Sequence, residues 1–171
     1  MKKIITVIMT ILLVFSLAAC SGGSGGSGGK PEPKDPYENY NKYEFDDIAV
    51  YIPKEITVSK SSIENYQYCL DSNHLAVFGN NLAGSTVREL GYDLNDLEPL
   101  LKFAMPGYEF TKSEFGYYTL YDNADAGFSY AYVAVAANDT LYEMNIACKL
   151  EEKDTYGAVV KDIAEKIQEK K

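Results

Sequence analysis

The sequence has no tryptophan and a single histidine among its 171 residues. A Ser-His-Asp or Cys-His catalytic set would therefore have to use His74, which lies beside a turn at the start of a predicted strand. A surface or hydrogen-bonding role suits a histidine at that position better. A glycine-rich phosphate loop is also lacking, since the glycines between positions 22 and 29 precede no helix. These absences predict a protein that is not an enzyme and that uses no cofactor.

Basic residues are in the minority, with 16 Lys and Arg against 25 Asp and Glu and a net charge of −9. Such a surface repels nucleic acid phosphates, so we expect no nucleic acid partner. The acidic stretch from Asp93 to Glu98 superficially resembles a calcium loop. It lacks the glycine and the distant bidentate glutamate of an EF-hand, and a helix cap at Asp96 explains its composition. The sequence therefore predicts no metal site.

Cysteine is scarce, with three residues in the chain. Cys69 and Cys148 both fall in stretches that are typical of strands. In an exported protein such a pair can form a disulfide, but free cysteines are also among the most buried residues. The sequence alone does not place the two thiols within bonding distance, so both interpretations stay open.

The first residues have the pattern of an export signal. Lys2 and Lys3 supply positive charge, residues 4–15 are almost continuously apolar, and small residues follow. The apolar stretch is shorter than the roughly 20 residues of an ordinary membrane span. A cleaved signal peptide is therefore favoured over a transmembrane helix.

The four residues that end this signal, Leu17-Ala18-Ala19-Cys20, resemble the lipobox of bacterial lipoproteins. The resemblance implies that the Cys20 thiol carries a diacylglycerol and that the chain is cut before this residue. It also implies that the protein is anchored by this lipid on the extracytoplasmic side of the cell membrane. The membrane is therefore an expected partner. We expect a signal peptide over 1–19, a lipidated cysteine with a flexible Gly/Ser/Pro tether over 20–36, and a single domain over 37–171.

Alternating apolar residues predict about six strands in that domain, near 45–52, 66–70, 74–79, 108–121, 128–137 and 141–150. Helices are expected to begin at Ser85 or Thr86, at Asp96, and at Asp154 or Thr155. Short turns such as Asn138-Asp139 connect several strands, which favours antiparallel pairing. The fold class is therefore α+β, with an antiparallel sheet of about six strands packed between or against two or three helices.

This order of elements resembles the PsbP-like fold. Two stretches carry the resemblance: the opening strand from Phe45 to Pro53, and the last strand from Leu141 onward, which runs into the stripe Tyr156, Ile163 and Ile167. The resemblance implies an antiparallel sheet between helices. It carries no signature residues, so no functional residue is transferred from it. A cystatin-like fold is the alternative.

Tyrosine is abundant, with 15 residues. Tyr130 and Tyr132 lie on one face of the predicted strand 128–137, where they either pack under the helices or line a binding surface. Together with the missing catalytic set, they favour a non-catalytic binding or accessory module for a partner protein. Binding of a small molecule or a glycan at Tyr130 and Tyr132 is the alternative.

Overall fold

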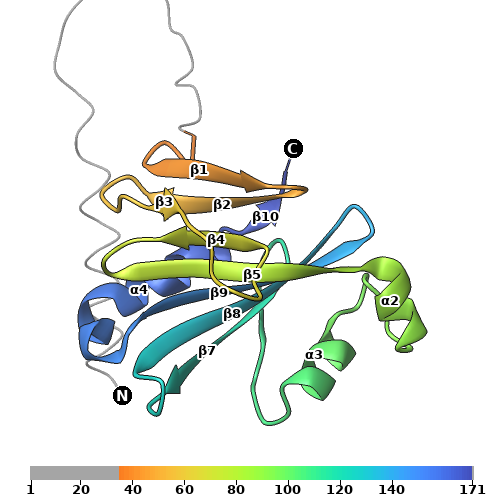
Figure 1. Cartoon of the computed structure of the whole chain (residues 1–171). Coiled ribbons are helices and arrows are strands. Elements are labelled where there is room, and N and C mark those ends of the chain that lie inside the picture. The colour runs from red at the N-terminus through yellow and green to blue at the C-terminus, as the bar shows by residue number, and fades with distance from the viewer. Residues whose placement is uncertain (1–34, 171) are drawn as a thin grey trace, which may run out of the picture. The chain divides into compact units, whose positions relative to one another are not determined.

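The computed structural model describes residues 35–170, which form two antiparallel sheets and three α-helices (Figure 1). The expected signal peptide, Cys20 and most of the tether lie outside the described residues. The larger sheet contains, in spatial order, β3 (Ser59–Lys60), β4 (Tyr68–Asp71), β5 (Leu75–Ala83), β9 (Thr140–Lys149), β8 (Phe128–Ala137), β7 (Tyr117–Asn123) and β6 (Thr111–Lys112). The smaller sheet contains β1 (Tyr40–Phe45), β2 (Ile48–Pro53) and β10 (Gln168–Glu169). The helices are α2 (Gly84–Glu89), α3 (Glu98–Ala104) and α4 (Lys153–Glu165), the last preceded by a 3₁₀ turn at Leu150–Glu152.

The centre of the larger sheet is the hairpin of β8 and β9. Each strand has ten residues, and they pair without a break from Phe128↔Lys149 to Ala137↔Thr140. Its turn is Asn138-Asp139, and both residues have positive φ angles, 45° and 58°. Asparagine and aspartate tolerate this conformation better than other non-glycine residues, which makes them suited to a two-residue hairpin turn. The turn predicted from the sequence is therefore the one that sets the register of the sheet.

The two faces of the larger sheet are covered differently. On the first face, α4 and the smaller sheet enclose the main core, which includes Ile48, Ile52, Val133, Met144, Ile146 and Ile163. On the second face, α2 and α3 pack over a smaller core made of Val87, Leu97, Leu100, Leu101, Tyr132, Ala134 and Leu141. Because α2 directly follows the end of β5, these two helices lie toward that end of the sheet (Figure 1). The opposite end of the second face receives no helix from the described residues.

The α+β class and the antiparallel sheet are confirmed, but the expected number of about six strands is too low. The expected range 108–121 contains two strands, β6 and β7. The strands outside the expected ranges are β1, β3 and β10, and the last two have only two residues. Strands this short have too few residues to show an alternating pattern, so they depend on a neighbour for their conformation. The expected caps are also wrong: the N-cap residues of the three helices are Ala83, Leu97 and Glu152, and none makes a side-chain cap hydrogen bond.

Cys69 and Cys148 do not form a disulfide: both are free cysteines, and both are buried. Cys69 is paired with Phe78, which in turn is paired with Asn145 on β9. Directly opposed residues share a face of a sheet, whereas residues three apart on a strand lie on opposite faces. Cys148 is three positions from Asn145, so the two thiols are on opposite faces of the sheet. Cys69 instead lies 2.9 Å from the Ser61 hydroxyl.

Candidate functional site

The uncovered end of the second face carries a cluster of aromatic side chains. We call Tyr108, Tyr121, Phe128 and Tyr130 the aromatic surface. The rings of Tyr121 and Tyr130, which are paired across β7 and β8, stack at 5.1 Å between centroids and 14° between planes. Tyr108 meets Tyr121 edge-on at 5.3 Å, and Phe128 lies 6.0 Å from Tyr130. Tyr108 and Phe128 are exposed, and the stacked pair between them is half-buried.

The hydroxyl groups of this surface differ from those of the five tyrosines that hydrogen-bond to carboxylates. Five tyrosine hydroxyls donate hydrogen bonds to carboxylates within the domain, namely Tyr40 to Asp162, Tyr68 to Asp46, Tyr118 to Glu165, Tyr132 to Glu143 and Tyr142 to Asp47. No such partner occurs for Tyr108, Tyr121 or Tyr130 among residues 35–170. Burial raises the pKa of Tyr121 and of Tyr130, so both hydroxyls stay protonated and able to donate.

The two predicted binding residues therefore have different environments. Tyr130 belongs to the aromatic surface, whereas Tyr132 is only 8% exposed and lies in the core beneath α3. The ring of Phe110 meets Tyr132 edge-on at 6.2 Å. Burial and the nearby Glu143 carboxylate raise the pKa of Tyr132, so it remains a neutral donor to Glu143. Tyr132 is thus placed to support the sheet and is closed to a ligand, while Tyr130 is open.

The Tyr132→Phe variant is expected to lose about 1 kcal/mol of unfolding free energy, because it removes the hydroxyl that donates a hydrogen bond to Glu143. Tyr130→Phe is the matched control, since it removes a hydroxyl without a partner from the same strand face, and its change should stay within about 0.5 kcal/mol. Urea denaturation of both variants measures the difference. Equal losses in the two would contradict the assignment of Tyr132 to the core and Tyr130 to the surface.

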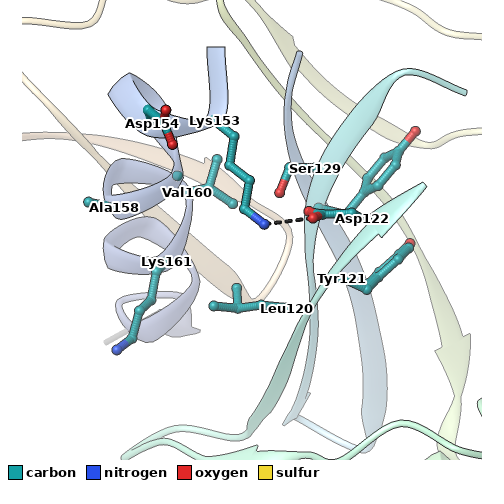
Figure 2. A pocket seen from close by; sticks show the side chains of 11 residues that line it. Leu120, Tyr121, Asp122, Ser129, Lys153, Asp154, Ala158, Val160 and Lys161 are labelled. Carbon is teal, nitrogen blue, oxygen red and sulfur yellow. Dashed lines mark hydrogen bonds and ion pairs between the residues drawn. The ribbon is translucent and has the colours of Figure 1, made fainter. Parts of the chain in front are cut away.

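A groove lies on the other side of β7, between this strand and α4. Its volume is about 560 Å³, and its apolar lining comes from Leu120, Gly157, Ala158 and Val160. Figure 2 shows Lys153 on α4 reaching toward Asp122 on β7, with 2.6 Å between the ammonium nitrogen and the carboxylate oxygen. This contact, together with the Ser129 hydroxyl, lowers the pKa of Asp122. Sequence reasoning missed the groove, because its walls are more than 30 positions apart and no local pattern links them.

The remaining sequence candidates have structural explanations. The His74 ring stacks on Tyr156 at 4.8 Å, and its Nδ1 lies 3.1 Å from Glu152, which confirms a surface hydrogen-bonding histidine. Asp93 accepts hydrogen bonds from the backbone and side chain of Asn95 in a local turn. Between residues 35 and 170 there is no cluster of three or more His, Cys, Asp or Glu that could hold a metal ion. In the same range, no helix is both long and apolar enough to cross a membrane.

Fold and surface together define an α+β domain that has a partly uncovered aromatic sheet face. No family model matches the chain, and no curated protein matches it. Among solved structures, the chain is similar to the solution structure of cyanobacterial PsbP (CyanoP) from Synechocystis sp. PCC 6803. The two share 10% identity over 87% of this chain and 98% of that chain, with a TM-score of 0.47. The expected PsbP-like resemblance thus has a counterpart among known structures, but we transfer no function, ligand or partner from a similarity this low.

Proposed function

We propose that this protein is a lipid-anchored lipoprotein on the extracytoplasmic side of the cell membrane and a non-catalytic binding or accessory module. In this proposal Cys20 carries the lipid and the folded domain holds a partner protein at the membrane. The observation that carries it is the aromatic surface, where Tyr121 and Tyr130 combine apolar rings with hydroxyls that lack partners in the domain. Tyrosine is enriched in protein interfaces because it offers both features with little conformational entropy to lose.

Ring geometry favours a protein over the glycan or small-molecule alternative. A sugar stacks on an open aromatic face, but the facing sides of Tyr121 and Tyr130 are occupied by each other at 5.1 Å. The rings and hydroxyl groups of this stacked pair suit the polar and apolar mixture of a protein surface.

Site-directed photo-crosslinking in intact cells tests this proposal. A photoreactive phenylalanine derivative replaces Phe128 on the aromatic surface or, as the control, Phe103 on α3, which is 71% exposed. We expect a reproducible protein adduct from position 128 and none from position 103. Combining the probe with Tyr121→Ala and Tyr130→Ala should reduce the adduct at least tenfold, because the central ring pair is gone.

A second tyrosine pair provides the matched control for that double variant. Tyr37 and Tyr51 stack at 4.1 Å and 29° near the smaller sheet, away from the aromatic surface in the larger one. Tyr51→Ala should therefore leave the adduct at position 128 unchanged. The proposal is wrong if adducts form equally from positions 103 and 128, or if position 128 yields no protein adduct. An adduct containing glycan and no protein would support the alternative function.

A further inference from the structure

Strand β7 is an edge strand over most of its length. β6 pairs only with Tyr117 and Tyr118, whereas β7 continues to Asn123. The chain that precedes β6 adds no backbone hydrogen bond to β7, although the register places Tyr108 opposite Tyr121 and their rings meet edge-on at 5.3 Å. Among residues 35–170, no strand therefore pairs with the outer side of β7 from Thr119 to Asn123.

The hydrogen-bond pattern shows which backbone groups face this open side. In an antiparallel sheet, successive residues direct their N–H and C=O groups alternately to the two neighbouring strands. The Ser113 N–H donates to the Gly116 carbonyl at 2.8 Å, which places Gly116 and then Tyr118 toward β6. Continuing the alternation places Leu120 and Asp122 toward the open edge.

The hydrogen bonds between β8 and β9 lead to the same assignment of outward-facing residues on β7. Leu150 N–H donates to the Gly127 carbonyl at 2.9 Å, so Gly127 and Ser129 direct their backbone groups toward β9. Phe128 and Tyr130 therefore face β7, where their partners are Asn123 and Tyr121. The intervening residues Leu120 and Asp122 are again the ones whose donors and acceptors point outward.

Exposed edge strands usually carry a proline, a bulge or an uncompensated charge that prevents pairing with another chain. This edge has no proline between Tyr117 and Asn123, and the Asp122 carboxylate is compensated by Lys153. The Leu120 side chain is 49% exposed at the mouth of the groove (Figure 2). The edge is thus both open to a new strand and bordered by an apolar groove.

We propose that an extended segment of a partner protein adds to β7 as a further strand and places an aliphatic side chain in the groove beneath α4. Backbone hydrogen bonds to Leu120 and Asp122 would provide affinity, and the groove would provide specificity, as in other domains that bind peptides by strand addition. Side chains on the other face of the added strand would contact Tyr108 and Tyr121. This site adjoins the aromatic surface through Tyr108 and Tyr121, and it goes beyond the proposed function because it rests on the open backbone edge and the groove.

The geometry selects this occupant over others. Only an extended backbone matches donors and acceptors that recur at every second residue of a strand. The apolar groove lining of Leu120, Ala158 and Val160 selects an aliphatic side chain, and its volume of about 560 Å³ accommodates one. The net charge of −9 favours a segment that is neutral or basic.

The test begins with a displayed library of random eight-residue peptides, selected on the full-length protein in detergent. An enriched peptide is synthesised, and its affinity is measured by fluorescence anisotropy. Single N-methylation at each position then removes one backbone donor at a time. We expect at least tenfold weaker binding from every second position and little change from those between, since only alternate amides face β7. Failure to enrich any peptide, or a loss without this alternation, would overturn the proposal.

Two variants of the protein test the edge and the groove. Leu120→Pro removes an outward N–H, together with the Leu120 side chain at the mouth of the groove, while leaving the ladder to β8. Gly157→Leu fills the groove from α4 and leaves β7 unchanged. The Cβ added at Gly157 meets only the flexible Lys153 side chain, at 3.3 Å, so the second variant should fold even if the first does not. Each should weaken peptide binding at least tenfold. Leu90→Lys, at a leucine that is 58% exposed on another part of the surface, is the control and should bind normally.

Two further outcomes separate the interpretations. Light scattering that shows a dimer in the unmodified protein, lost in Leu120→Pro, would assign the edge to a second copy of this chain and overturn the partner proposal. Amide hydrogen exchange at Leu120 and Asp122 should slow on peptide binding, while Tyr121 is already protected by β8. Crosslinking from position 128 reports on the aromatic surface independently, so failure of either proposal can be recognised without the other.

Discussion

The Cys20→Ala variant is expected to leave the membrane fraction or to remain as an uncut precursor. In the lipobox interpretation of Leu17–Cys20, the diacylglycerol is attached to the Cys20 thiol. Each buried methylene contributes about 0.8 kcal/mol to membrane binding, and two or more acyl chains are needed for durable anchoring. Without the thiol, none of that free energy is available. Fractionation of cells, followed by intact mass measurement of the protein, determines both location and processing.

Cys69→Ala is the matched control for this experiment, since Cys69 is buried in the folded domain. It should remain in the membrane fraction with the mass of the lipidated protein. The prediction fails if Cys20→Ala stays anchored and is still cut after Ala19. Such a result would mean that the export signal is an ordinary one and that another feature holds the protein at the membrane.

The Ile163→Ala variant is expected to lose about 2–5 kcal/mol of unfolding free energy, because Ile163 is fully buried in the main core. It extends from α4 toward the first face of the larger sheet, so its truncation removes apolar contacts and leaves a cavity between the two layers. For a domain of this size the loss corresponds to a melting temperature lower by roughly 6–25 °C. Thermal unfolding followed by circular dichroism measures the change.

Lys161→Ala on the same helix is the control. Its side chain is half exposed and forms only a 3.8 Å ion pair with Glu165, so its effect should stay within about 0.5 kcal/mol. A small effect at Ile163, comparable with that at Lys161, would mean that α4 does not pack on the sheet as described. The groove between α4 and β7 would then lose its structural basis as well.

Tertiary contacts separated residues that the sequence treats as equivalent. Tyr130 and Tyr132 lie on the same face of β8, two positions apart. Nothing in the neighbouring sequence distinguishes a binding residue from a core residue at these positions. Their environments differ because α2 and α3 extend from the end of β5 and cover Tyr132 but not Tyr130. The partner of each tyrosine hydroxyl depends likewise on chain segments up to 122 positions away, as in the bond from Tyr40 to Asp162.

The same reasoning applies to the cysteines and the groove. Cys69 and Cys148 are both strand residues, and only the register through β5 and β9 places them on opposite faces. The open edge of β7 depends on where its pairing with β6 ends, at Tyr118, and no local pattern marks that position.

What the sequence by itself determined is local. The Asn138-Asp139 turn follows from residues that tolerate positive φ, and the long strands and α4 follow from alternating and helical apolar spacing. The prediction of export and lipidation at Cys20 also rests on contiguous residues alone. Only the tertiary structure decided which tyrosines are open, which thiols are apart and which strand edge is free. These properties depend on contacts between distant segments, and such contacts leave no pattern in neighbouring residues.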